Sequence, residues 1–299
     1  MGLDINGAQF FISARRRGVR FGDVLTLGRQ SLHVFPPKMV KELTRAGLPT
    51  GAFTAGGEVC EFADPLFECL GATSVSAMDA SDFEGARYVQ DLNEPIPEEL
   101  RERFDTVFDG GTLEHVFNFP QGLKNCMEMV RPGGRMFIHN CANNLCGHGF
   151  YQFSPELYFR AFSPENGFKV ERIVLHVIGP YGRWYQVTDP DEIKSRVDLW
   201  TFSPIMILVE AKRIAAVPIF AKAPQQSDYS VMWREHDKVV NPANTSAIPP
   251  TMAQKRSWLA GRAPGLARFI SAMKTGWYLF RRQSLRGNDE FYTRVGRRD

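Results

Sequence analysis

The stretch Phe104-Asp105-Thr106-Val107-Phe108-Asp109-Gly110-Gly111-Thr112-Leu113-Glu114-His115-Val116 decides the fold of this chain. An apolar strand ends abruptly in Asp-Gly-Gly and is followed by an acidic turn that carries a histidine. In open α/β sheets, ligands bind outside the carboxyl ends of the strands. The polar residues of this turn are therefore the first candidates for chemistry.

Strands and helices alternate on both sides of this stretch. Three further strands are expected before it and three after it, at 23–27, 74–78, 87–90, 135–139, 168–177 and 204–211. Helices are expected at 36–46, 63–70, 95–103 and 120–130, and another begins with Ser154 as its cap and Pro155 at its first position. This alternation is typical of a doubly wound, mostly parallel sheet, so we predict an α/β fold.

The chain divides into three predicted parts: an α/β domain at 1–215, a linker at 216–250 and a basic, helical C-terminal extension at 251–299. Between Pro218 and Pro250, scattered Pro, Ser, Gln and Asn show little periodicity, which indicates an extended linker. In the extension, apolar residues return at helical spacing, at Leu266, Phe269, Ile270, Met273 and Trp277.

Composition indicates an ordinary soluble globular protein, with 43% hydrophobic and 23% charged residues. The longest apolar run, Ile205 to Val209, is far shorter than the roughly 20 residues that a membrane span needs. The first residues lack the pattern of a secretory signal. Five cysteines, an odd number without framework spacing, favour reduced thiols. We therefore expect a cytoplasmic protein.

The net charge of +3 is unevenly distributed. From Thr251 onward there are 11 Lys or Arg against 3 Asp or Glu, a net charge of +8. A helix from Leu266 to Phe280, followed by Arg281-Arg282, has the composition of a segment that contacts an anionic membrane. We expect this helix to pack on the main domain with solvated arginines, and contact with an anionic membrane is the alternative. Nucleic acid is not expected as a partner, because no recognised binding module accompanies the charge.

A second motif follows the opening stretch: Val130-Arg131-Pro132-Gly133-Gly134-Arg135 leads into an apolar strand, Met136 to Ile138. Together the two motifs resemble the class I S-adenosylmethionine-dependent methyltransferases. In that family the fourth strand runs into an acidic turn, often followed by Leu-Glu-His, and a Pro-Gly-Gly turn precedes the fifth. The resemblance covers about Val24 to Lys212. It implies a Rossmann-like fold, S-adenosylmethionine as cofactor, and methyl transfer to a hydroxyl of a small-molecule or sugar (glycan) acceptor.

The resemblance also implies which residues hold the cofactor. Asp79 ends the second strand, where a carboxylate accepts from both ribose hydroxyls. Asp91 ends the third strand and would accept from the adenine amino group, with Leu92 beside the ring. Asp109 and Gly110 would border the methionine moiety and the methyl group. The alternative for each Asp is a turn former that bonds its local backbone.

The loop after the first strand departs from the family pattern. The family has a Gly-x-Gly-x-Gly type loop there, whereas this chain has only Gly28 for a close approach to the cofactor. Arg29 adds a positive charge, which is unfavourable beside a sulfonium unless it turns toward the cofactor's carboxylate. An inactive relative that serves as a binding scaffold is therefore the alternative function. A dinucleotide-dependent oxidoreductase is weakened by the lack of Gly-x-Gly-x-x-Gly.

Histidine is the natural general base for a hydroxyl acceptor, because its pKa lies near neutrality. Methyl transfer itself is an in-line displacement that depends mainly on positioning. We expect His148 as the catalytic residue, since its flanking glycines and aromatics suit a loop over a cleft, and His115 as the second candidate. His139 is also near the expected cleft. The alternative for any of the three is a hydrogen-bonded structural histidine.

Two further patterns have competing interpretations. Two histidines and two cysteines could complete a zinc shell: His139, Cys141, Cys146 and His148. Their spacings are tighter than those of the usual zinc knuckle, so we expect no metal there and expect the two cysteines to be small buried residues. The aromatic run from Gly179 to Tyr185 could stack on a sugar or pack against the sheet edge.

Overall fold

The computed structural model describes residues 2–54, 61–82, 84–179, 182–229 and 264–297. The chain forms two compact units by its internal contacts. The first consists of Met1–Val187, Phe202–Pro224 and Arg294–Asp299, and the second of Thr188–Thr201 and Gln225–Thr293. Most of the expected linker, and the start of the expected extension up to residue 263, lie outside the described residues.

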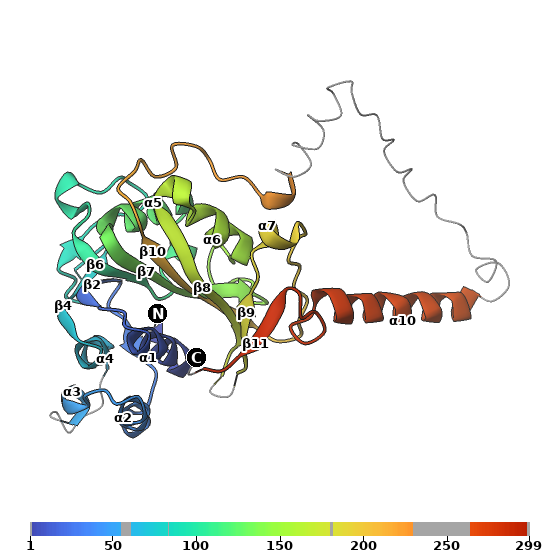
Figure 1. Cartoon of the computed structure of the whole chain (residues 1–299), viewed down its shortest axis with the longest axis horizontal. Coiled ribbons are helices and arrows are strands. Elements are labelled where there is room, and N and C mark those ends of the chain that lie inside the picture. Colours follow the sequence, from blue (N-terminus) through green and yellow to red (C-terminus); the bar gives the residue numbers. More distant parts are fainter. Residues whose placement is uncertain (1, 55–60, 83, 180–181, 230–263, 298–299) are drawn as a thin grey trace. The chain divides into compact units, whose positions relative to one another are not determined.

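One twisted sheet organises the first unit (Figure 1). The order of its strands is β11-β9-β8-β10-β7-β6-β2-β4-β5. Of the edge strand β11, only the end belongs to this unit. Strands β5, β4, β2, β6 and β7 are parallel, and β10 runs antiparallel to β7 and β8. The strands are β2 (Gly22–Leu27), β4 (Ala72–Asp79), β5 (Tyr88–Val89), β6 (Phe104–Asp109), β7 (Val130–Asn143), β8 (Phe168–Val177), β9 (Trp184–Val187), β10 (Ile205–Arg213) and β11 (Tyr292–Val295).

The doubly wound α/β fold is confirmed. The chain winds outward from β2 to β5 and then returns to β6, so the order reverses between β2 and β6. This reversal is the switch point at which such sheets bind ligands. All seven expected strands are present. Strand β7 is longer than the expected 135–139: it begins at Val130, opposite Phe104, and the Pro-Gly-Gly segment forms an irregularity in the ladder before Arg135 pairs with Thr106.

Five helices also match the expectation: α2 (Pro36–Arg45), α4 (Asp64–Cys69), α5 (Phe119–Met129), α6 (Pro155–Ala161) and α10 (Pro264–Gln283). Helix α4 is followed by Gly71 with φ +85°, a left-handed conformation that glycine adopts without strain. Ser154 occupies the cap position of α6, but its side chain makes no capping hydrogen bond.

The charged helix expected at 95–103 is wrong. Only Glu98–Leu100 form a single 3-10 turn, η1. Pro95 and Pro97 have no N–H to donate, and Glu102 has a φ of +52°, which is incompatible with a continuing helix. Charged residues on an exposed loop produced the helical pattern.

The N-terminal elements were not anticipated. Strand β1 (Gly2–Leu3) pairs with β3 (Ser31–Leu32), and helix α1 (Ile5–Arg16) follows. Asp4 caps α1 by accepting from the backbone N–H groups of residues 6 and 7. The helix buries Phe10 and Phe11 in an aromatic core, where Phe11 lies 4.9 Å from Phe108 between ring centroids.

The remaining short elements are α3 (Gly51–Thr54), α7 (Pro190–Ile193), η2 (Leu113–His115) and η3 (Pro164–Asn166). In the aromatic run at 179–185, Trp184 and Tyr185 are buried in β9, so they pack in the sheet and do not offer faces to a sugar. Tyr181 lies outside the described residues. Among the described residues, no helix combines the length and the apolar content that crossing a bilayer requires.

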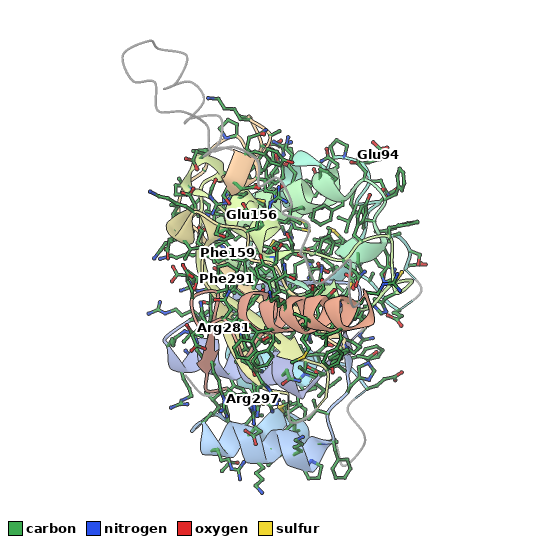
Figure 2. All side chains as sticks on the ribbon, turned by 90° about the vertical axis from the view of Figure 1, so that its right-hand side faces the viewer. Glu94, Glu156, Phe159, Arg281, Phe291 and Arg297 are labelled. Atoms are coloured by element: carbon green, nitrogen blue, oxygen red, sulfur yellow. The ribbon has the colours of Figure 1, made fainter. Side chains whose placement is uncertain are left out.

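Helix α10 dominates the second unit. Its end is tied to the segment 188–201: Gln283 donates to the Asp198 carboxylate at 3.1 Å, and the Tyr292 hydroxyl donates to the Asp198 carbonyl at 2.9 Å. Side chains project along the helix, among them Arg281 (Figure 2). Ile270 is partly buried, but six other large apolar side chains described on the helix are at least half exposed: Leu266, Phe269, Met273, Trp277, Tyr278 and Phe280.

Candidate functional site

The loop after β2 folds back over the switch point. Gly28 has a φ of +67°, and its N–H donates to the Met78 carbonyl at 2.6 Å. Two side chains cap the last carbonyl of β2: the Thr112 hydroxyl donates to the Leu27 carbonyl at 2.8 Å, and the Gln30 carboxamide donates to the same oxygen. The ends of β2 and β6 are thereby joined by side chains from the loops that follow them.

Gln30 explains why residue 110 is a glycine. A Cβ placed on Gly110 would lie 2.2 Å from Gln30 Oε1, so the carboxamide occupies the space of a side chain. Gln30 is buried, and among the described residues its Oε1 has no hydrogen-bond donor. A buried acceptor without a donor is costly unless something else supplies one. The sequence did not indicate Gln30.

Asp109 is a structural residue of the turn after β6. Its side chain is completely buried; Oδ1 accepts from the N–H of Thr112 at 2.8 Å and of Leu113 at 3.3 Å, and Oδ2 accepts from Asn140 at 2.8 Å. Burial raises its pKa. The expectation that the Asp109 carboxylate borders the methionine moiety is therefore corrected: it holds the turn together and is not presented to a ligand.

Asp79 and Asp91 lie on neighbouring segments. Asp79 ends β4 half-buried, its carbonyl accepts from the Gln90 N–H at 2.8 Å, and its carboxylate has no partner among the described residues. Asp91 is exposed, and its Oδ1 accepts from the backbone and the side chain of Asn93, at 2.9 and 2.8 Å. These bonds lower its pKa. Asp91 forms the local turn as the alternative predicted, while its Oδ2 takes no part in it; Leu92 is buried.

Arg29 does not enter the switch point. Its guanidinium lies 3.9 Å above the Phe62 ring, its Nε is 4.0 Å from Asp64, and Nη1 donates to the Glu84 carbonyl at 3.4 Å. Arg29 thus makes its contacts with protein groups of the neighbouring segments. Its positive charge is partly balanced by Asp64, which reduces the conflict with a sulfonium.

Three titratable residues meet just beyond β6, and we call Glu114, His115 and His148 the turn cluster. Glu114 is buried, and both of its carboxylate oxygens lack a hydrogen-bond partner among the described residues. Its Oε1 lies 3.7 Å from His148 Nε2. Burial, with a smaller contribution from Asp109, raises the pKa of Glu114 to about 8. Perturbed carboxyls next to a histidine are typical of functional sites.

The loop that carries His148 is fastened to Glu114. The Phe150 N–H donates to the Glu114 carbonyl at 2.8 Å, and a Cβ on Gly149 would lie 2.7 Å from that oxygen, so this position requires glycine. The His148 side chain remains 51% exposed. The His115 ring lies 5.5 Å from that of His148 between centroids, and burial lowers its pKa. The structure thus brings both predicted histidines together around Glu114, whose role the sequence left secondary.

Among the described residues, two groups place at least three metal-binding donor atoms within 4.8 Å of one another. One is the turn cluster. The other, which we call the buried cluster, consists of Asp4, His139 and His176. Neither contains a cysteine, so the zinc shell considered from the sequence does not assemble. Cys141 is buried, as expected, and donates to the Tyr151 carbonyl at 3.3 Å. The same expectation is wrong for Cys146, which is exposed.

No protein-family model matches the chain. It is similar to the ubiquinone biosynthesis O-methyltransferase of Agrobacterium fabrum (strain C58), with 28% identity over 170 residues, 52% of this chain and 63% of the relative. The chain thus covers less than two thirds of that relative's length.

The search of solved structures also gave matches with low TM-scores. One is a Bacillus halodurans protein whose name reads 'putative methyltransferase' (13% identity, 68% of this chain, 99% of the other, TM-score 0.37). Another is the Burkholderia thailandensis 1,6-didemethyltoxoflavin-N1-methyltransferase with S-adenosylhomocysteine (15%, 71% and 80%, TM-score 0.36). A third is the branched-chain polyamine synthase of Thermus thermophilus (14%, 74% and 61%, TM-score 0.37). The chain thus combines a doubly wound sheet and an acidic turn after β6 with similarity to a curated O-methyltransferase.

Proposed function

We propose that the chain is an S-adenosylmethionine-dependent methyltransferase that methylates a hydroxyl of a small-molecule or sugar acceptor. The similarity to an O-methyltransferase favours oxygen as the acceptor atom. The observation that carries the proposal is the pairing of Glu114 with His148 at the carboxyl end of β6: a buried carboxyl lies 3.7 Å from a half-exposed imidazole. A scaffold without catalysis has no need of such a pair.

The residues at the switch point fit the cofactor at three positions. The Asp79 carboxylate would accept from the ribose hydroxyls, and Asp91 Oδ2 from the adenine amino group. Gln30 Oε1, a buried acceptor beside Gly110, would receive an N–H of the methionine ammonium. The single glycine after β2 is compatible with this fit, because Arg29 is held aside by Phe62 and Asp64. When bound, the cofactor supplies an electrophilic methyl group on its sulfonium.

The protein's part in the reaction is to hold the acceptor and to move one proton. The exposed ring of His148 would take the proton of the acceptor hydroxyl as its oxygen is methylated. Glu114 stands behind His148 and, once ionised, stabilises the imidazolium that forms. Since the pKa of Glu114 is about 8, Glu114 is mostly protonated at neutral pH and ionises as pH rises through that value.

Calorimetric titration with S-adenosylmethionine and S-adenosylhomocysteine tests cofactor binding. We expect heat with both ligands in the full chain, and at least about a tenfold loss of affinity in Asp79→Ala, as a lost charge-assisted hydrogen bond would cause. Asp82→Ala, which removes an exposed carboxylate from the neighbouring loop, is the matched control. No heat with either ligand would favour the scaffold, and heat with a nicotinamide dinucleotide instead would favour the oxidoreductase.

We further propose that α10 lies on an anionic membrane surface. Leu266, Phe269, Met273, Trp277 and Phe280 follow one another at helical spacing and are at least half exposed. The helix contains Arg268, Lys274, Arg281 and Arg282 but no acidic residue. An exposed apolar stripe among cations has the chemistry of the interface of anionic lipid.

Flotation with vesicles tests this contact. We expect the full chain to float with vesicles that contain phosphatidylserine, and less in high salt. Replacing Phe269 and Trp277 by Asp should abolish flotation without lowering turnover on a soluble acceptor. Equal flotation of this double variant, or binding to RNA in place of vesicles, would contradict the membrane contact.

A further inference from the structure

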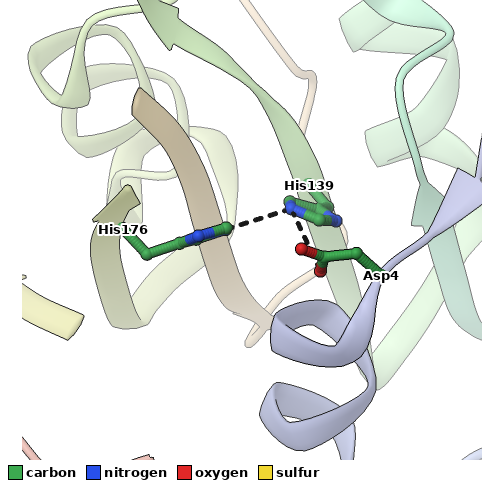
Figure 3. A group of neighbouring side chains, drawn as sticks. All are labelled: Asp4, His139 and His176. Carbon is green, nitrogen blue, oxygen red and sulfur yellow. Dashed lines mark hydrogen bonds and ion pairs between the residues drawn. The ribbon is translucent and has the colours of Figure 1, made fainter. Parts of the chain in front are cut away.

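The start of α1 meets two histidines from the sheet. Asp4 caps the helix, His139 comes from β7 and His176 from β8, and the two strands flank β10 (Figure 3). His139 Nε2 and His176 Nε2 are 3.2 Å apart, and Asp4 Oδ1 is 4.0 Å from His139 Nε2. All three residues belong to the first unit.

The orientation of the His176 ring is set by its second nitrogen. His176 Nδ1 lies 3.1 Å from the Val177 carbonyl, which can only accept, so Nδ1 carries the proton. Nε2 therefore presents its lone pair toward His139 and Asp4. A backbone carbonyl that fixes the far nitrogen of a histidine is the usual outer-shell partner of a metal ligand.

The charges of the buried cluster suit a cation. His176 is completely buried and His139 nearly so, while the Asp4 side chain is 32% exposed. Burial lowers the pKa of both histidines, which favours the neutral form of the ring. The Asp4 carboxylate supplies the negative charge that faces the two rings, and Arg297 is a nearby cation.

We propose that Asp4, His139 and His176 bind a divalent transition-metal ion, zinc by ligand type, which ties the start of α1 to strands β7 and β8. Two imidazoles and a carboxylate, with water in the fourth position, form an established zinc ligand set. Nitrogen ligands of tetrahedral zinc are about 3.3 Å apart, because each Zn–N bond is about 2.0–2.1 Å. The 3.2 Å between the two Nε2 atoms matches this edge. The partly exposed Asp4 provides the side from which an ion and its water enter.

Two neighbours connect this ion to the rest of the fold. A Cβ on Gly7 would lie 3.0 Å from His139 Nδ1, so the helix can approach the ring only because residue 7 is glycine. His139 is followed by Asn140, which donates to the buried carboxylate of Asp109. The ion would thus hold β7 through His139, while the next residue of the same strand, Asn140, holds the turn after β6 through Asp109.

Cobalt(II) titration of the metal-free full chain tests the proposal. We expect one equivalent to bind with the intense visible bands of tetrahedral cobalt and without a thiolate charge-transfer band. Asp4→Asn keeps a capping oxygen for α1, so it should fold, yet it should lose at least about tenfold in cobalt affinity. His176→Asn should lose the bands. Zinc should raise the Tm of the wild type and not that of Asp4→Asn.

The turn cluster supplies the matched control. His148→Asn removes a histidine from the other carboxyl–histidine group and should leave the cobalt spectrum unchanged. The proposal is overturned if the wild type shows no tetrahedral bands, if they persist in both Asp4→Asn and His176→Asn, or if His148→Asn abolishes them. None of these measurements requires methyltransferase activity, so they stand apart from the proposed function.

Discussion

The turn cluster and the buried cluster are built from the same residue types, one carboxylate and two histidines, but differ in their access to solvent. In the turn cluster the carboxylate is buried and the His148 ring is half exposed. In the buried cluster the rings are enclosed, and only the carboxylate of Asp4 reaches the surface. A ring that reaches solvent can exchange a proton with a substrate, whereas enclosed rings can only bind each other or an ion. Exposure, not composition, therefore separates a candidate for catalysis from a candidate for cross-linking.

The largest effect is expected from His148→Ala. Loss of a general base should reduce turnover by about 100- to 10,000-fold, while affinity for S-adenosylmethionine stays unchanged. Steady-state kinetics and calorimetry on the same preparation measure both quantities. His115→Ala should cost less, because the His115 ring does not contact Glu114 in the way that His148 does. Unchanged turnover in His148→Ala would remove His148 from the mechanism.

A substitution in the buried cluster should affect stability. His176→Ala removes a completely buried ring and its bonds to His139 and Val177, so we expect a loss of about 2–4 kcal/mol in the free energy of unfolding. Denaturant unfolding of the metal-free protein measures this. His148→Ala should change stability by less than about 0.5 kcal/mol, as exposed side chains usually do. Similar losses for both variants would erase the distinction between the clusters.

Glu114→Gln should make stability less dependent on pH. The folded protein holds the Glu114 proton up to about pH 8, whereas the unfolded chain releases it near 4.5. Stability is therefore lost as pH rises through this window, and the neutral Gln avoids the loss. Above the window we expect the variant to be more stable than the wild type by about 2 kcal/mol. Glu98→Gln, which removes an exposed carboxylate, should show no such gain.

The smallest effects are expected from two glycines that touch the clusters. Gly149→Ala would push the loop of His148 away from the Glu114 carbonyl and should lower turnover by about tenfold. Gly7→Ala would crowd His139 and Leu3 and should cost about 1 kcal/mol of stability, with turnover per folded molecule unchanged. Unfolding curves and kinetics on both variants measure these effects. If Gly149→Ala lowers only stability and Gly7→Ala lowers only turnover, the two clusters do not have the roles described above.

Much of the fold was predictable, because strands and helices that bury one face repeat their apolar residues locally. The expected strand at 168–177 coincides with β8, and the expected helix at 36–46 differs from α2 by one residue. The helix expected at 95–103 does not form, because the spacing of its charged residues takes no account of Pro95 and Pro97, which have no backbone N–H to donate. Helix α1 was missed because it is buried on most sides, with the polar Asn6 and Ser13 also enclosed, so its sequence does not show one apolar face opposite a polar one.

The candidate site was predicted only in part. His115 and His148 could be named from local motifs, since one follows β6 and the other lies between glycines. They meet around Glu114 because the loop after β7 folds back onto the turn after β6, and the positions of these residues along the sequence do not predict that contact. Asp109 looked like a ligand-facing carboxylate, but a turn former and a site residue have the same sequence pattern, and only its complete burial distinguishes them.

The succession of strands and helices along the chain, the acidic turn after β6 and the Pro-Gly-Gly segment were determined by the sequence, because hydrophobic periodicity and turn chemistry act over a few neighbouring residues. The pairing of Glu114 with His148, and of Asp4 with His139 and His176, was decided by the tertiary structure alone. Asp4 and His176 are 172 positions apart along the chain. They meet because the start of α1, which Asp4 caps, lies against the sheet at the position of His176 on β8. Burial and the pKa values that follow from it arise at that stage, since they depend on what surrounds a group and not on its neighbours in sequence.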